Sequence, residues 1–225
     1  MAQNNGIANE PSGSFIRRYQ EATGVSAALY NGKVSIPYVK QATNHPYFQS
    51  ANHTRGKLCY NRVVYEDILL RIDLFRDEVT VMFPDLPHRI VLDNAKIQYA
   101  IVHGATFVVS DSGSDANQKL LVLLHNGSIP VFRRYRVTLF EETMSFRSLT
   151  RSFKTQMQCA VGIDGEFYTV KNKNALFKLF PDRKKELNEY AKLHKLNFKK
   201  QLEQAVIDLV EYYETLTGGT QITQI

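Results

Sequence analysis

Basic and aromatic residues alternate in the second half of the chain, and this is the pattern with the clearest chemical meaning. Residues 131–200 hold 16 Lys and Arg against 7 Asp and Glu, a local charge of +9, whereas the rest of the chain carries −3 and the whole chain +6. Such cations neutralise phosphates or carboxylates, and rings between them can stack on bases. The candidate basic binding face consists of Arg133, Arg134, Tyr135, Arg136, Arg147, Arg151, Lys154, Arg183, Lys184 and Lys185.

Three kinds of partner are compatible with this face. An acidic protein, an anionic surface and a nucleic acid are all attracted by positive charge. A solvated basic face is nevertheless common on proteins of every class, and the interleaved rings can equally face the core. We therefore expect a protein partner or an envelope surface, and a polyanion or nucleic-acid binder is an alternative.

Three carboxylates, Asp73, Asp77 and Glu78, lie close together in the sequence. Glycoside hydrolysis requires two carboxyl groups about 5 to 9.5 Å apart. However, the three residues flank a predicted hairpin turn at Arg76-Asp77, and Asp is favoured in turns because of its local hydrogen bonds. We expect turn chemistry here. A hydrolase whose site is assembled from distant residues is the second alternative function.

Other residue types with catalytic or metal-binding chemistry lack the necessary spacing. None of the six histidines forms an HxH or HExxH motif, and no GxSxG motif or Gly-rich phosphate loop occurs. His103 and His125 each precede a Gly-containing turn, where we expect a turn role. The polar residues 111–118 predict a flexible loop. The sequence thus predicts a non-catalytic binding or structural module without a metal or cofactor.

Cys59 and Cys159 are the only cysteines. One disulfide between them would close a loop of about 100 residues, worth up to roughly 4.7 kcal/mol in the chain-entropy model. Each lies in an apolar, strand-like context, where a buried free thiol is common. Two free thiols are the favoured interpretation.

A helix over residues 197–218 is the clearest structural element. Leu202, Val206, Leu209, Tyr213 and Leu216 are spaced four, three, four and three apart, so they form one apolar stripe, which Ala205 and Val210 widen. The stripe predicts packing against the rest of the chain. Asn197 is expected to cap the start and Gly218 to end the helix in a left-handed conformation. The acidic residues, Glu214 included, are expected on the wet side.

Short apolar segments separated by turn residues fill the region from Val25 to Val170 and predict an antiparallel meander. Residues 141–155 are ambiguous between a loop and an irregular helix. Hairpin turns are predicted at Asn31-Gly32, Asn61-Arg62, Arg76-Asp77, His103-Gly104, Asn126-Gly127 and Asp164-Gly165.

Helical patterns follow at residues 175–180, with Asn174 as the cap, and at residues 181–195. Strands followed by helices indicate an α+β fold, in which a twisted sheet or partly open barrel packs with two or three C-terminal helices. We predict a disordered leader at 1–14, a single domain at 15–218 that begins with a short helix at 14–22, and a flexible tail at 219–225. No apolar run is long enough for a transmembrane helix. The polar first residues suit a mature secreted protein whose signal peptide has been removed, and an ordinary cytoplasmic N-terminus is the alternative.

The order of segments resembles a large group of uncharacterised secreted or envelope proteins of Bacteroidota. The resemblance covers roughly residues 28–216. It rests on the segments 56–79, 103–108 and 167–213, and on the run from Leu179 to Leu187 that follows the sheet-forming region. It implies an extracytoplasmic location, and it implies no activity.

Overall fold

The computed structural model describes residues 29, 32–38, 42–82, 88–110, 118–145 and 148–218, with their side chains except those of residues 143–149. The predicted leader, the helix expected at 14–22, most of the loop at 111–118 and the C-terminal tail lie outside these residues. Arg147 of the candidate basic face lies outside them as well.

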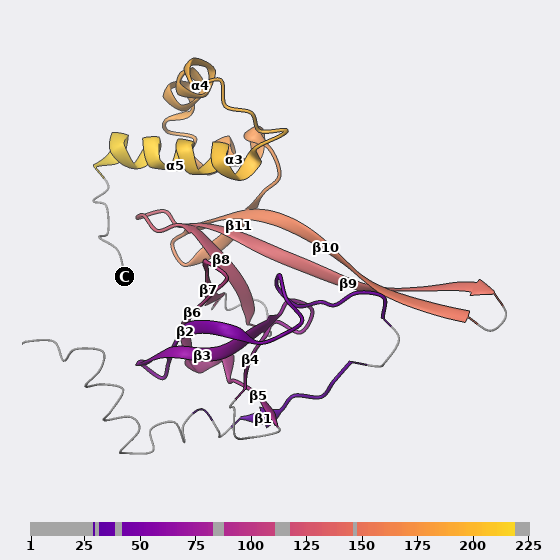
Figure 1. Ribbon diagram of the computed structural model, residues 1–225. Helices are drawn as coiled ribbons and strands as arrows, with labels where there is room; N and C mark the ends of the chain where they lie inside the picture. The colour runs from indigo at the N-terminus through magenta and orange to yellow at the C-terminus, as the bar shows by residue number, and fades with distance from the viewer. Residues whose placement is uncertain are drawn as a thin grey trace, which may run out of the picture.

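The described strands form one antiparallel sheet of 11 strands (Figure 1). Its order is β1-β5-β4-β3-β2-β6-β7-β8-β9-β10-β11, so most neighbours in the sheet are also neighbours in the chain. The strands are β1 (Lys33–Val34), β2 (Thr54–Tyr60), β3 (Val63–Asp73), β4 (Glu78–Met82), β5 (Arg89–Val91), β6 (Ile97–Val102), β7 (Ala105–Ser110), β8 (Lys119–His125), β9 (Val131–Ser145), β10 (Ser148–Ile163) and β11 (Glu166–Val170). The predicted meander and the α+β class are therefore confirmed.

Local turn chemistry explains which hairpins were predicted correctly. Asn61 and Arg62 have φ angles of 53° and 64° between β2 and β3, and Asp164 has a φ of 52° between β10 and β11. A two-residue hairpin of type I′ requires such left-handed conformations. Of the hairpin predicted at Asn31-Gly32, the turn residue Asn31 and the first arm lie outside the described residues, except Leu29, which is not in a strand; the second arm is β1, which pairs with β5.

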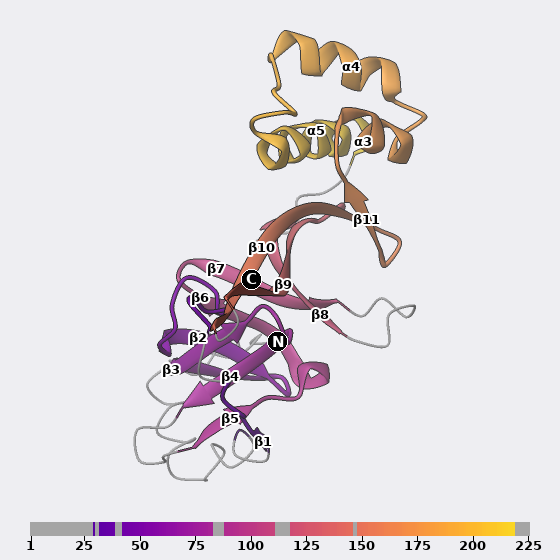
Figure 2. The same ribbon diagram turned by 90° about the vertical axis from the view of Figure 1, so that its right-hand side faces the viewer.

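The sheet curves around a first hydrophobic core, which β2, β3 and β7 line with Leu58, Leu70 and Phe107, all fully buried. Figure 2 shows this curvature from β8 to β3, and the sheet remains open. Tyr135 and Val137 of β9 pack against the same core. The curl therefore buries one face of the sheet without help from the helices.

The segment 42–48, which we call the strap, links the two sides of this curl. The Thr43 N–H donates to the Arg151 carbonyl of β10 at 2.8 Å. At the other end, the Phe48 N–H donates to the Ile72 carbonyl of β3 at 3.0 Å. The Asn44 side chain extends the link, since it both donates to and accepts from the Phe153 backbone. The strap thus holds β10 near β3.

Three helices form a second core on the β9–β11 end of the sheet (Figure 1). They are α3 (Lys173–Leu179), α4 (Lys184–Leu193) and α5 (Leu202–Thr217). Val206, Leu209 and Val210 of α5 are almost fully buried, and they belong to the same core as Val131 and Val161 of the sheet. The predicted apolar stripe is confirmed.

The helix ends are only partly as predicted. Gly218 ends α5 with a φ of 73°, as expected. Asn197, however, accepts from the Lys199 and Lys200 amides in the turn before α5, which begins only at Leu202. The cap of α3 is Asn172 and not Asn174, because the helix begins two residues earlier than predicted.

The region 141–155 was predicted as a loop or an irregular helix, but residues 141–145 belong to β9 and residues 148–155 to β10, while 146 and 147 lie outside the described residues. The two strands pair along nearly their whole length. Glu141 pairs with Arg151 across the strands at 2.5 Å, and the Lys154 ammonium lies 4.0 Å above the centre of the Phe140 ring. Cross-strand pairs of this kind stabilise a hairpin by about 0.2 to 1 kcal/mol each. Their partners lie ten or more residues apart, which an inspection of local periodicity does not reveal.

Candidate binding surface

The structure divides the candidate basic face into three separate places. Arg133 forms two hydrogen bonds with Glu203 of α5, at 2.7 and 2.5 Å, and this pairing raises the pKa of its guanidinium. Arg151 is paired with Glu141, and Arg183 lies 3.4 Å from Glu186. These three cations are already neutralised within the chain.

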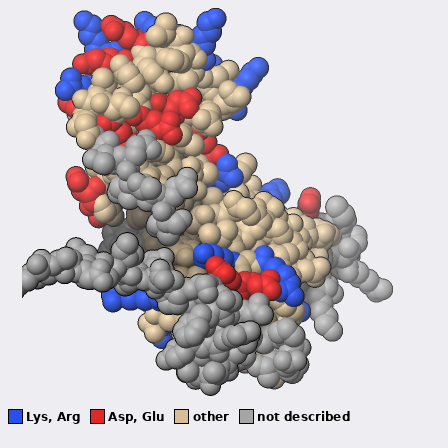
Figure 3. Space-filling model, turned by 60° about the vertical axis from the view of Figure 1, so that its left-hand side comes forward, with Lys and Arg blue, Asp and Glu red and all other residues tan. Residues whose placement is uncertain are grey.

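Lys184 and Lys185 are exposed at the start of α4, in the helical layer and away from the long hairpin. In the face of the molecule that Figure 3 shows, Lys and Arg of the helical layer are mingled with Asp and Glu. A continuous basic surface from β9 to α4 is therefore not formed.

Arg134, Arg136 and Lys154 are brought together. Side chains alternate along a strand, and the register pairs Arg134 with Gln158 and Thr138 with Lys154 across the hairpin, so the three cations share one face. No described carboxylate lies within salt-bridge distance of any of them. Tyr135 lies on the opposite face, where its ring centre is 5.7 Å from that of Phe48 in the core.

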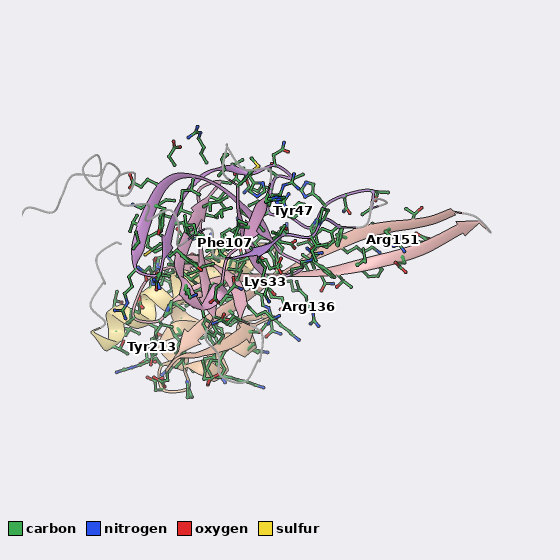
Figure 4. The ribbon with its side chains drawn as sticks, turned by 90° about the horizontal axis from the view of Figure 1, so that it is seen from below. Lys33, Tyr47, Phe107, Arg136, Arg151 and Tyr213 are labelled. Carbon is green, nitrogen blue, oxygen red and sulfur yellow. The ribbon has the colours of Figure 1, made fainter. Side chains whose placement is uncertain are left out.

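From its last pair with β8, the hairpin continues as a two-stranded arm, residues 134–145 and 148–158. The pairing between β8 and β9 stops at Leu121 and Arg134. Figure 4 shows the arm extending past the rest of the described ribbon, with Arg136 near its base and Arg151 farther out. Leu139, Phe140 and Met157 are exposed by 36, 43 and 65%. The arm thus combines free cations with exposed apolar side chains.

The burial of the Glu214 carboxylate is the main feature that the sequence did not predict, because its position in the helical pattern placed it on the solvent-exposed side of α5. Glu214 is only 4% exposed, and it lies against the turn between β8 and β9. Its Oε1 accepts from the Ser128 hydroxyl at 2.9 Å and from the Ile129 amide at 2.7 Å, and its Oε2 accepts from His125 Nε2 at 2.9 Å. A Cβ on Gly127 would lie 2.3 Å from Glu214 Oε1 and from His125 Nε2, so a side chain here would displace these groups.

Ser128, His125 and Glu214 are residue types of a hydrolytic triad, but their arrangement is different. The Ser128 hydroxyl donates to the carboxylate and not to the histidine, so the Ser–His pair of such a triad is not formed. His125 lies between Glu214 and, at 3.3 Å, Glu211. His125 pairs with Val131 across the β8–β9 turn, so it does flank the turn, and through Glu214 the group also acts as a latch between α5 and the sheet.

A cleft of about 910 Å³ lies near the β3–β4 turn, beside β5 and the start of β8. Burial raises the pKa of both Asp77 and Glu78, which line it. The Asp77 carboxylate is occupied, because it accepts from the Leu120 amide at 3.2 Å and lies 3.2 Å from Lys119 Nζ. Asp77 is thus committed to holding β8, and Asp93, the third acid of the lining, accepts from the Ala95 amide and lies 3.3 Å from Lys96 Nζ. Among the described acids of the cleft, only Glu78 has no such partner.

Asp73 has the turn role predicted for it. Its Oδ1 accepts from the Phe75 and Arg76 amides at 3.0 Å each, and the Tyr38 hydroxyl donates to the same carboxylate at 2.7 Å. The buried Arg71 lies nearby on β3, with its guanidinium 3.8 Å from the centre of the Tyr47 ring. These contacts fasten the strap to the sheet.

Cys59 and Cys159 are both buried and both free, as favoured. Burial raises the pKa of each thiol, to about 12 for Cys159. No group of three His, Cys, Asp or Glu in the described part of the chain is placed to hold a metal ion. None of the described helices is both long enough and apolar enough to cross a membrane.

Comparisons with known proteins were made at three levels. No family model, no curated protein and no solved structure matches the chain. The function must therefore be argued from the site alone.

Proposed function

We propose that the protein is a non-catalytic binding module that acts through protein–protein contacts, outside the cytoplasm, and that the arm is its binding surface. The observation that carries this proposal is the arm itself. It extends beyond the sheet with Arg134, Arg136 and Lys154 on one face, unpaired with any described carboxylate. The extracytoplasmic location rests on the resemblance to secreted and envelope proteins.

Two physical arguments support a role in recognition. The strap bonds to Arg151 and Phe153 on the β10 edge of the arm, and Val137 packs against the first core. The β9 edge beyond Arg134 and the face with the exposed Arg136 and Phe140 are not covered by described residues, and a two-stranded hairpin gains little stability by itself. In addition, Arg136 and Lys154 share a face of the arm with the exposed Phe140, and this matches the composition of interfaces, in which Arg and aromatic residues are enriched. An acidic protein surface is the partner that this chemistry favours.

Affinity capture from the native source tests the proposal. The double variant Arg134→Glu/Lys154→Glu reverses two cations on the arm, and Lys184→Glu/Lys185→Glu makes the same charge change on α4. We expect a partner to be retained by the wild type and the α4 variant but lost by the arm variant, provided that all three melt at similar temperatures. Equal retention by all three would refute the arm as the binding surface.

The polyanion alternative is tested in the same format with a single-stranded oligonucleotide. Three phosphate contacts predict that log K falls with log salt with a slope of about −2. Binding with this slope, lost in the arm variant, would replace the acidic protein by a nucleic acid as the partner.

A further inference from the structure

The outer edge of β9 has free backbone groups along the arm. The Gly162 amide of β10 donates to the carbonyl of Pro130, the residue just before β9. Because hydrogen-bonded pairs recur at every second residue of an antiparallel ladder, the even-numbered residues of β9 direct their N–H and C=O groups toward β10. The odd-numbered residues direct theirs away from β10. β8 covers this edge only as far as the Leu121–Arg134 pair. The backbone groups of Val137, Leu139 and Glu141 therefore have no partner among the described residues.

We infer that this edge is covered by β9 of a second copy, in an antiparallel pair with a twofold axis at Leu139. The inference rests on the proposed function, because it takes the arm to be an interaction surface. It assigns a second copy to the β9 edge, whereas the acidic partner would contact the face with Arg134 and Lys154. A long free strand edge pairs readily with another strand, and proteins normally cover or block such edges. The three free residues form a self-complementary set in this arrangement.

The register follows from which positions are free and which side chains face each other. With the axis at Leu139, Val137 lies opposite Glu141 of the second copy, and the two Leu139 residues face each other. These three facing pairs supply about six backbone hydrogen bonds, two for each pair. On the other face, Arg136 lies opposite Glu142 of the second copy, so two opposite-charge pairs form, one at each end.

Neighbouring registers are less complementary. An axis at Thr138 would place Glu142 opposite Arg134, where Leu121 of β8 already pairs. An axis at Phe140 would place Glu142 opposite Thr138 and leave Arg136 without a carboxylate. The axis at Leu139 is thus the register near the middle of the free edge that matches Arg136 with an acid.

The end of the arm also fits this arrangement. In this register residue 143 of one copy lies opposite residue 135 of the other copy, next to the place where β8 of that other copy begins to cover β9. Each arm must therefore bend away at residue 143. The pairing of β9 with β10 becomes irregular at this point, between Ser148 and Leu149. A bulge bends its strand and increases the local twist.

Sedimentation equilibrium from about 1 μM to about 1 mM tests the inference, a range that includes weak interfaces. We expect wild-type protein to pass from monomer to dimer. Leu139→Pro removes an outward N–H without breaking the ladder with β10, and should weaken the dimer at least tenfold. Thr155→Pro is the matched control, because it removes an outward N–H on the opposite edge of the same hairpin, and should leave the dimer unchanged.

Charge exchange tests the register. Arg136→Glu and Glu142→Arg should each weaken self-association, because each creates two like-charge pairs. An equimolar mixture of the two variants should recover dimers, since every facing pair is then of opposite charge.

A wild type that remains monomeric throughout, or a dimer insensitive to Leu139→Pro, would overturn the inference. So would a mixture of the charge variants that stays monomeric while each variant is folded. If self-association fails in this way but the capture experiment still shows a partner lost in Arg134→Glu/Lys154→Glu, the proposed function stands and only the second copy is refuted. The reverse result would leave the dimer and refute the acidic partner.

Discussion

Replacement of Glu214 provides the most informative test of how the helical layer is fastened to the sheet. The carboxylate is in the last turn of α5, where the helix dipole disfavours a negative charge by about 0.3 to 1 kcal/mol. Three donors offset this cost: the Ser128 hydroxyl, the Ile129 amide and His125 Nε2. Since hydrogen bonds to charged groups contribute roughly 1.5 to 3 kcal/mol each, the latch is a large part of the stability of a typical domain.

Glu214→Ala should lower the free energy of unfolding by about 3 to 5 kcal/mol, because it removes a buried carboxylate and leaves the part-buried Ile129 amide and His125 without an acceptor. Glu214→Gln should cost less, about 1 to 2 kcal/mol. The glutamine carbonyl can still accept from Ser128 and Ile129, while its amide can donate to His125 in the other tautomer. The size of the side chain is thus kept and only the charge is lost.

Urea denaturation at pH 7, followed by circular dichroism, measures both values. Glu211→Gln is the matched control, because this carboxylate also contacts His125 but is about half exposed, and its loss should cost under about 1 kcal/mol. A loss below about 1 kcal/mol for Glu214→Ala, or equal losses for all three variants, would refute the latch.

Three further predictions concern Leu209 of α5, His53 before β2, and the two cysteines. Leu209→Ala should destabilise the protein by about 2 to 5 kcal/mol, because Leu209 is 1% exposed, and a change below about 0.5 kcal/mol in urea denaturation would contradict its burial. Burial, aided by Arg71 and Arg89, lowers the pKa of His53 to about 4, so the unfolded chain binds more protons below pH 6.5. Stability should therefore fall as the pH drops from about 6.5 toward 4, and His53→Gln should flatten that slope; an unchanged slope would be incompatible with the buried neutral histidine. Cys59 and Cys159 should resist a thiol reagent in the native state and react after unfolding, whereas rapid native labelling of Cys159 would show that it is accessible.

Features that depend on neighbouring residues were predictable from the sequence. The Asn61-Arg62 and Asp164-Gly165 turns were identified because two adjacent residues suffice to favour the left-handed conformation. The stripe of α5 was identified because helical periodicity is visible within one segment. Gly218 at the helix end follows from the same local chemistry.

Features that depend on distant partners were not predictable in this way. Glu214 lies at the edge of the α5 stripe, and only a turn 85 residues earlier explains its burial. The length of β9 and β10 depends on pairing across the arm and on Asn44 of the strap, 109 residues from Phe153. The candidate basic face was divided for the same reason, since Arg133 finds its carboxylate on α5, 70 residues away.

Amide hydrogen exchange along the arm, resolved by NMR in dilute protein, tests the central claim most directly. The account predicts alternation on β9: the Thr138, Phe140 and Glu142 amides, which face β10, should be protected, and those of Val137, Leu139 and Glu141 should exchange rapidly. Concentrating the protein, or adding a captured partner, should protect the second set. Equal protection of both sets in dilute protein would show that the chain itself covers this edge, and would contradict the arm as a binding surface.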